Sequence, residues 1–202
     1  MKITSITQQV KTAGRYSVFV EGKYSFSLSE AVLVSSQIAS GQELDAAQLS
    51  AYKKLSADDK LYSRALRYAA MRSHSEWEVR FYLQRKEAPP DFIDEALRKL
   101  RDLGLVDDFK YAQNFVHDRR LLKPTSKRKL LMELRKKRVT HEAIEAALAE
   151  DEGTDSSALI EVIARKRRQS KYQDDTKLMQ FLARQGFGYD DIKRALRLAE
   201  DD

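Results

Sequence analysis

The residues with the clearest chemistry lie in one stretch, which runs from Arg119 to Arg138 and reads RRLLKPTSKRKLLMELRKKR. This basic stretch holds ten Lys or Arg and one acid, Glu133, so its local charge of +9 exceeds the net charge of +6 of the whole chain. The rest of the chain therefore sums to −3. Clustered cations bind phosphate groups or acidic protein surfaces. The sequence thus predicts a polyanionic partner and leaves open whether it is a nucleic acid or a protein.

The second half of the basic stretch is expected to form a helix that presents its cations on one side. At 100° per residue, three leucines share one face and are expected in the core: Leu130, Leu131 and Leu134. Four cations share the opposite face with Met132: Arg128, Lys129, Arg135 and Lys136. A charge run is usually only a solvated face, but the density and one-sidedness of this one favour binding.

A second basic cluster covers residues 165–171 and contains no acid. Six acids between Glu142 and Asp155 separate it from the basic stretch. For this cluster, a solvated face and a binding surface remain equally good interpretations. Thirteen cations are the predicted contacts to the partner: Arg119, Arg120, Lys123, Lys127, Arg128, Lys129, Arg135, Lys136, Lys137, Arg138, Arg165, Arg167 and Arg168.

No group of residues predicts an active site, a metal site or a cofactor site. The absence of Cys excludes a Cys nucleophile, thiolate zinc sites and disulfides. His74, His117 and His141 form no HExxH motif. The motifs GxxxxGKS/T and GxSxG are absent, and no predicted strand precedes Gly186-Phe187-Gly188. We therefore predict no catalytic residue, no metal and no cofactor, and a function other than that of an enzyme.

The sequence also bears on where the chain acts. The N-terminus MKITSITQQV lacks the apolar segment of a signal peptide. No apolar run approaches the roughly 18 residues that a membrane span needs. We expect a soluble, cytoplasmic monomer with no membrane contact.

Residues 1–28 alternate in polarity and predict a small β module. Residues 15–20 and 23–28 each place apolar residues on one face, and Glu21-Gly22-Lys23 supplies the turn between them. Ile3 and Ile6 are candidates for a third strand. We expect the aromatic rings of these strands to bury one face of a sheet, in preference to stacking on bases.

Two helices are expected to follow, and no strand is predicted after them. Ser29 is the expected N-cap of a helix that ends near Gly41, and Asp45 opens a longer helix toward Met71. Farther on, an acid at Asp107-Asp108 is expected to cap a helix that begins near Phe109.

The helical body repeats itself three times. A shift of 51 residues places Ser75 on Ser126, and a further shift of 48 places Ser126 on Asp174. Each of these residues is a helix-capping type, and Glu78 completes a capping box with Ser75. The same shifts align the apolar positions of the units: Val79, Leu130 and Leu178; Leu83, Leu134 and Leu182; Ile93, Ile144 and Ile192; Leu97, Leu148 and Leu196.

These patterns predict a mainly α fold, with three tandem three-helix repeats behind a small N-terminal module that contains a β-hairpin. One unit cannot bury its apolar face alone, so we expect the units to stack into an elongated, curved array. The predicted boundaries are 1–59 for the β/α module and 60–107, 108–152 and 153–202 for the repeats. The acidic segment EDEGTDSS, residues 150–157, is expected to be a flexible linker.

Several motifs of the helical body resemble the RecX regulatory family. The segment GLVDDFKYA at 104–112 is similar to the family's signature between its first and second repeats. The pattern of Ser126, Leu130, Leu134, Arg135 and Lys137 resembles the middle repeat, and RQGFGYDDI at 184–192 resembles the C-terminal repeat. The match covers about residues 60 to 200, and the β module resembles an extension found in some members.

This resemblance implies a regulator and not an enzyme. Members of the family bind the RecA recombinase filament on DNA, lodge in its helical groove and restrain its ATPase and strand exchange. The chain would then act in homologous recombination, DNA repair and the SOS response, with RecA and single- or double-stranded DNA as its partners. The shared motifs are mostly structural, so they identify no catalytic residues. The alternative is a stand-alone helical repeat protein that binds nucleic acid without sequence preference.

The chain departs from the family at the ends of two repeat helices. The Gly that usually follows the basic pair is Glu87 in the first unit and Arg138 in the second, and only Gly186 keeps it. Because a left-handed helix end favours Gly, we expect the first two of these helices to end in a different conformation.

Overall fold

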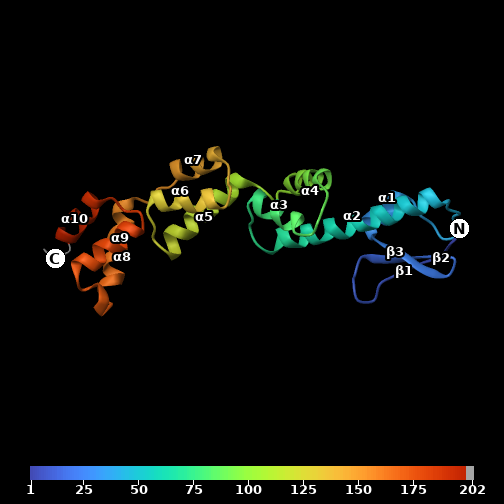
Figure 1. Ribbon diagram of the computed structural model, residues 1–202, viewed down its shortest axis with the longest axis horizontal. Coiled ribbons are helices and arrows are strands. Elements are labelled where there is room, and N and C mark those ends of the chain that lie inside the picture. The colour runs from blue at the N-terminus through green and yellow to red at the C-terminus, as the bar shows by residue number, and fades with distance from the viewer. Residues whose placement is uncertain (199–202) are drawn as a thin grey trace. The chain divides into compact units, whose positions relative to one another are not determined.

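The computed structural model describes residues 1–198, which form three strands, ten α-helices and one short 3-10 turn. These residues divide into two compact units, each described separately below. The first contains residues 1–72 and 80–100, and the second contains residues 73–79 and 101–198. Figure 1 shows the order of the elements along the chain.

The first unit begins with an antiparallel sheet in the order β1-β2-β3, formed by β1 (Ile3–Gln8), β2 (Arg15–Val20) and β3 (Lys23–Ser29). Val18 is paired with Ile6 on one side and with Phe26 on the other. The predicted hairpin and third strand are thus confirmed. Ile3, Val18 and Phe26 are buried in one core, so one face of the sheet is apolar as expected.

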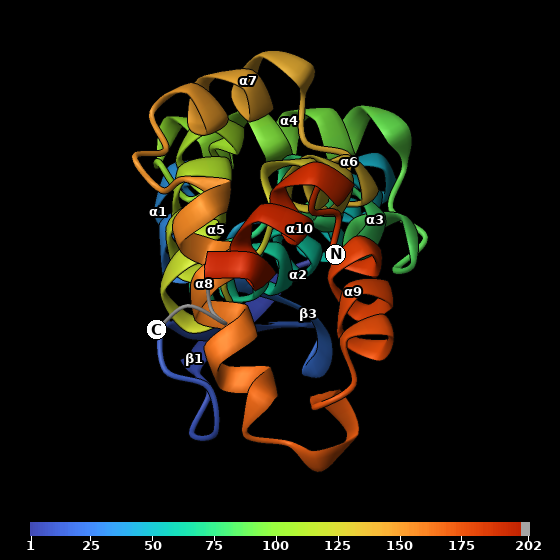
Figure 2. The same ribbon diagram turned by 90° about the vertical axis from the view of Figure 1, so that its left-hand side faces the viewer.

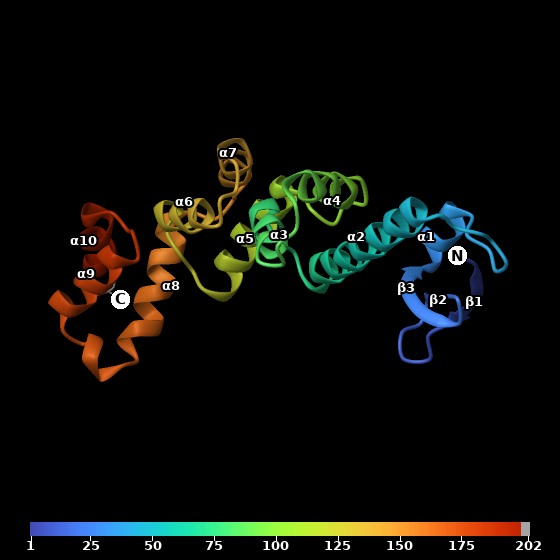
Figure 3. The same ribbon diagram turned by 45° about the vertical axis from the view of Figure 1, so that its right-hand side comes forward.

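Two helices cover this sheet: α1 (Glu30–Ser36) and α2 (Ala46–Met71), as Figure 3 shows. Ser29 caps α1 and Asp45 caps α2, as predicted. Helix α1 ends earlier than expected, because Gln37 already adopts a left-handed φ of 52°. Helix α2 is continuous across residue 59, where the sequence places the end of the β/α module.

The buried Asp59 ties the sheet to the middle of α2. Its carboxylate accepts hydrogen bonds from Ser29 N (2.8 Å) and Ser29 Oγ (2.6 Å) and pairs with Arg15 at 3.0 Å. The backbone N–H at the start of α1 and the charge of Arg15 are therefore satisfied by one side chain of α2.

The first repeat adds α3 (Glu76–Gln84) and α4 (Pro90–Asp102) to α2. In the first unit, the ring of Tyr68 on α2 stacks on Tyr82 of α3 at 4.2 Å between centroids. Arg80 of α3 pairs with Asp94 of α4 at 2.8 Å. These contacts hold the three helices together around buried alanines and leucines.

The second unit contains the other two repeats. Their helices are α5 (Asp108–Leu122), α6 (Lys127–Lys136) and α7 (His141–Ala149), then α8 (Asp155–Arg167), α9 (Asp175–Arg184) and α10 (Tyr189–Leu198), with the 3-10 turn η1 (Ser170–Tyr172) after α8. Each set of three packs around its own core, one built on Leu130 and Leu134 and the other on Leu178 and Leu182. Figure 2 shows α8, α9 and α10 as one such group.

The predicted caps are all present. Ser75, Ser126 and Asp174 each accept a hydrogen bond from the backbone N–H three residues later. Glu78 in turn accepts from Ser75 N, which completes the capping box. Asp107, the first acid of the Asp107-Asp108 pair, caps α5.

The expectation that two repeat helices end differently from the third is wrong. Glu87 and Arg138 adopt φ values of 58° and 56°, in the same left-handed region as Gly186 at 88°. In each case the next residue donates its N–H to a carbonyl five positions back: Ala88 to Leu83, Val139 to Leu134 and Phe187 to Leu182. The backbone hydrogen bonds and the burial of Ala88, Val139 and Phe187 therefore impose a conformation that Glu and Arg disfavour.

Glu87→Gly is consequently expected to stabilise the protein. Removing Cβ from a left-handed residue relieves steric strain, and the larger entropy of Gly in the unfolded chain offsets part of the gain. We expect the free energy of unfolding, measured with urea, to rise by about 0.5–1 kcal/mol. Glu87→Ala removes the side-chain atoms beyond Cβ but keeps Cβ itself, so the steric strain remains and this variant should not stabilise the protein. An equal gain in both variants would contradict this explanation.

Candidate interface for an anionic partner

Helix α6 is fixed in the second unit by its cap and by its leucines. Ser126 caps its N-terminus, and Leu130 and Leu134 are fully buried between α5 and α7. Leu131 is partly buried against the same core. The prediction that the leucines hold this helix in the core is therefore confirmed, and the cations of α6 project from a rigid support.

Three of the predicted cations of α6 face solvent together. Arg128, Arg135 and Lys136 are exposed, and Met132, which lies among them, is 51% exposed. Within residues 1–198, none of these three cations forms an ion pair or a side-chain hydrogen bond. We call Arg128, Arg135 and Lys136 the α6 basic face. Lys123, Lys127 and Arg138 are also exposed, and Lys127 Nζ donates to the carbonyl oxygen of Leu148 at 3.3 Å.

Arg119 and Arg120 bind other parts of the chain. Arg119 Nε lies 2.9 Å from Glu133 Oε2, a contact whose angle is poor for a hydrogen bond, and its guanidinium covers the ring of Phe115 at 5.0 Å. Arg120 is largely buried and pairs with Asp151 at 2.7 Å and with Asp155 at 3.3 Å. The Arg120 side chain is therefore not available to a partner.

Arg120 also corrects the prediction of a flexible linker. It donates to Gly153 O at 3.1 Å, and a Cβ on Gly153 would lie 2.9 Å from Arg120 Nε. Gly at this position leaves the space that the guanidinium fills. The connection between α7 and α8 is thus held at Asp151, Gly153 and Asp155 by one arginine.

Lys129 and Lys137 belong to a junction that recurs between successive repeats. Ser126 Oγ donates to Gln185 O at the end of α9, and Ser75 Oγ donates in the same way to Lys137 O at the end of α6. Lys129 Nζ binds Gln185 Oε1, and Lys137 Nζ pairs with Glu78 at 2.8 Å. The sequence pattern placed Lys129 on the outward face, whereas the structure places it against the next repeat.

An aspartate at the start of the following repeat completes each junction. Asp108 accepts from Glu76 N at 2.8 Å, and Asp155 accepts from Lys127 N at 2.8 Å. At the second junction the backbone at Gly186 lies so close to the start of α6 that a Cβ on Gly186 would be 2.5 Å from Ser126 Oγ. Gly186 is therefore needed both for its φ and for this approach.

The junction shifts the pKa values of two of its members. Burial opposes the charge of Lys137, but hydrogen bonds to Glu78 and Tyr111 outweigh it, so the pKa of Lys137 is raised. Burial raises the pKa of Asp108, although the backbone N–H groups of Glu76 and Thr140 lower it in part. Lys137 thus remains charged and bound to Glu78 at neutral pH.

The second basic cluster, like the first, contains both exposed cations and a cation that binds the chain itself. Arg165 and Arg168 are exposed. Arg167 donates to Gln173 O at 2.9 Å and pairs with Asp175, so it closes the turn between α8 and α9. The thirteen predicted cations therefore fall into an exposed set, which includes Lys127, and a half-buried set whose side chains bind the chain itself. The second set contains Arg119, Arg120, Lys129, Lys137 and Arg167.

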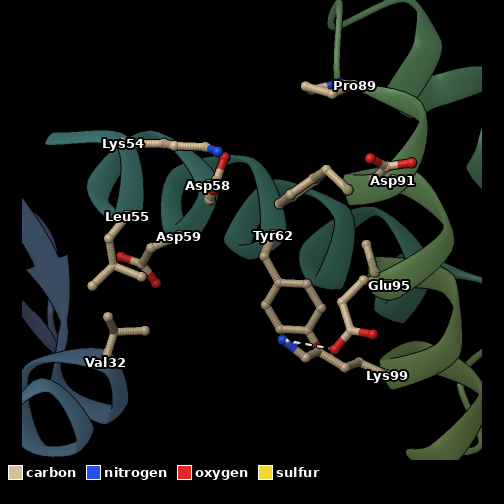
Figure 4. Close-up of a pocket in the computed structure, with 12 residues that line it drawn as sticks. Val32, Lys54, Leu55, Asp58, Asp59, Tyr62, Pro89, Asp91, Glu95 and Lys99 are labelled. Carbon is tan, nitrogen blue, oxygen red and sulfur yellow. Dashed lines mark ion pairs between the residues drawn. The ribbon is translucent and has the colours of Figure 1, made fainter. Parts of the chain in front are cut away.

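A groove of about 460 Å³ lies in the first unit. Leu55 and Tyr62 of α2 line it opposite α4, as Figure 4 shows. Glu95 at its edge pairs with Lys99 at 3.4 Å, and its hydrogen bond with Arg98 lowers the pKa of the Glu95 carboxyl to about 2. A carboxyl with so low a pKa is a poor general base near neutral pH.

Residues 1–198 contain neither a cluster of metal-ligating side chains nor a membrane-spanning helix. No three His, Asp or Glu side chains in this part of the chain converge on a point where a metal ion could bind. Nor does any helix within these residues combine the length and the apolar character that a membrane crossing requires.

Sequence reasoning missed the partners of the junction, which are Glu78, Asp108, Asp155 and Gln185. Helical periodicity gives the direction of a side chain but not the neighbour that it meets. The repeat itself carried a usable signal, since Asp108 and Asp155 are each the first residue of a helix and follow the equivalent capping serines Ser75 and Ser126.

Family models of RecX match all four parts of the chain. The model described as the regulatory protein RecX N-terminal domain matches residues 1–45. The models of the first, second and third three-helix domains of RecX match residues 62–100, 107–148 and 155–196.

Curated relatives and solved structures agree with these models. The regulatory protein RecX of Listeria monocytogenes serovar 1/2a is 32% identical over 194 residues, which cover 93% of this chain and 71% of the relative. That of Levilactobacillus brevis is 34% identical over 197 residues, covering 94% and 73%. A crystal structure of regulatory protein RecX has a TM-score of 0.74 at 27% identity and covers 97% of this chain and 98% of that one. The chain, with its three three-helix domains behind an N-terminal sheet, belongs to the RecX regulatory protein family.

Proposed function

We propose that the chain binds the RecA recombinase filament on DNA and restrains its ATPase and strand-exchange activities, thereby modulating recombination and DNA repair. In this proposal it acts as a monomer in the cytoplasm and catalyses no reaction of its own. The observation that carries the proposal is the α6 basic face. Its three cations have no partner within residues 1–198 and stand on a helix whose other side is core.

Rigid cations suit an extended anionic partner. Lys and Arg contacts to phosphates fix position without reading the base sequence, and each contact releases counterions. Arg165 and Arg168, exposed on the next repeat, add positive charge to the same unit. The exposed set, rather than all thirteen predicted cations, is therefore proposed to meet the filament.

Co-sedimentation with preformed RecA–DNA filaments tests this proposal. We expect the chain to pellet with filaments at both low and moderate salt, and with DNA alone only at low salt. The filament presents protein contacts as well as phosphates, so its affinity should fall less steeply with salt. Equal binding to bare DNA and filament at both salt concentrations would favour the alternative, a stand-alone nucleic-acid-binding protein.

A further inference from the structure

Helix α5 ends in two leucines that its own unit does not cover. Leu121 is 68% exposed and Leu122 is 73% exposed, although the core of this repeat lies along the same helix. Earlier in α5, Tyr111, Ala112 and Val116 are buried. The helix thus extends past its core and carries two large aliphatic side chains into solvent, and four residues separate its end from the start of α6. Figure 3 shows α5 and α6 with the loop that joins them.

The backbone around these leucines is held in place. Arg120 Nη1 donates to Thr125 O at 2.6 Å, and Thr125 Oγ1 donates to Lys123 O at 2.6 Å. Pro124, Thr125 and Ser126 are buried. Since the connection to α6 is fixed, Leu121 and Leu122 are presented in one position, which lowers the entropy lost when a partner covers them.

The exposed charges that follow the pair in the sequence are positive. Lys123, Lys127 and Arg128 follow within six residues of Leu122 and are exposed, while Asp118 is the one acid in the last two turns of α5. A complementary partner surface therefore carries acidic groups around an apolar depression. Phosphates supply the acidic groups but no depression that would take two aliphatic side chains.

We propose that Leu121 and Leu122 are an apolar anchor that docks on an acidic protein surface, which, if the proposed function holds, is the protein component of the RecA–DNA filament. Buried apolar side chains at the centre of a contact commonly carry much of its affinity, while surrounding charges guide the approach. In this proposal the leucines of the anchor bind the recombinase, and the cations of the α6 basic face bind phosphates.

The double variant Leu121→Ser/Leu122→Ser tests the anchor in the full-length protein. We expect its affinity for preformed RecA–DNA filaments to fall at least tenfold, because burial of two leucines is lost. Its binding to DNA alone, and the salt dependence of that binding, should be unchanged. Leu103→Ser is the matched control, since Leu103 is also well exposed (60%) in the same unit but lies outside the basic stretch.

A second variant separates apolar contact from charge. Leu121→Lys/Leu122→Lys adds two positive charges, so purely electrostatic binding would strengthen, whereas an apolar anchor would still be lost. Circular dichroism should show unchanged helix content in both variants, because the replaced side chains are exposed.

Each remaining outcome decides against the anchor. Unchanged filament affinity of the Ser variant would overturn it. An equal loss of affinity for bare DNA would identify the leucines as wedges between bases. If the unmodified protein itself fails to bind filaments, the proposed function falls and the anchor with it, and that failure is distinguishable because no substitution is involved.

Discussion

Replacing Arg128, Arg135 and Lys136 with Glu is expected to lower the affinity for RecA–DNA filaments about a hundredfold at low salt, as each lost phosphate contact weakens binding and each new carboxylate repels the backbone. The variant should also lose inhibition of the DNA-dependent ATPase of RecA. The slope of log affinity against log salt for DNA alone should become shallower by roughly three. These three side chains form no hydrogen bond or ion pair within residues 1–198, so the fold should not change.

The control for this experiment must match the change in charge. Lys53, Arg64 and Arg67 are exposed cations of α2, in the other unit, and the same replacement by Glu gives the same net charge. This control should keep most of the affinity. Lys129 is left in place because it binds Gln185, so its loss would disturb a junction between repeats. Full ATPase inhibition by the α6 variant would rule out the α6 basic face as the contact surface.

The parts of the fold that were predicted correctly depend on local chemistry. Ser75, Ser126 and Asp174 are capping residues because their side chains reach a backbone N–H three residues away. Leu130 and Leu134 are core because they repeat at helical spacing. Both kinds of information are contained within one turn or two of sequence, so the helices and their repeat could be inferred without a structure.

Local sequence patterns could not show which of the cations are free to bind a partner. Lys137 meets Glu78 across 59 residues of sequence, and Lys129 meets Gln185 across 56. Such contacts follow from how successive repeats dock, and periodicity alone treats both lysines as surface cations. The left-handed ends at Glu87 and Arg138 were missed for a related reason, since hydrogen bonds and packing there outweigh the local preference for Gly.

Arg120→Met is expected to be the most destabilising single substitution among the predicted cations. The side chains of Arg120 and Asp151 are 13% and 4% exposed, and the two bind at 2.7 Å. Arg120 also donates to Thr125 O at 2.6 Å and to Gly153 O at 3.1 Å. Its removal leaves a buried carboxylate and two carbonyl groups without their charged partner, and losing one member of such a pair costs about 3–5 kcal/mol.

The neighbouring arginine provides the comparison. Arg119 lies in a more exposed ion pair, with side chains 34% and 26% exposed for Arg119 and Glu133, so Arg119→Met should cost no more than about 1 kcal/mol. Urea unfolding followed by circular dichroism measures both losses. Arg120→Met/Asp151→Leu should recover part of the stability, because the buried charge is removed together with its partner. Equal losses for Arg119→Met and Arg120→Met would show that burial of the Arg120 pair does not hold the connection between α7 and α8.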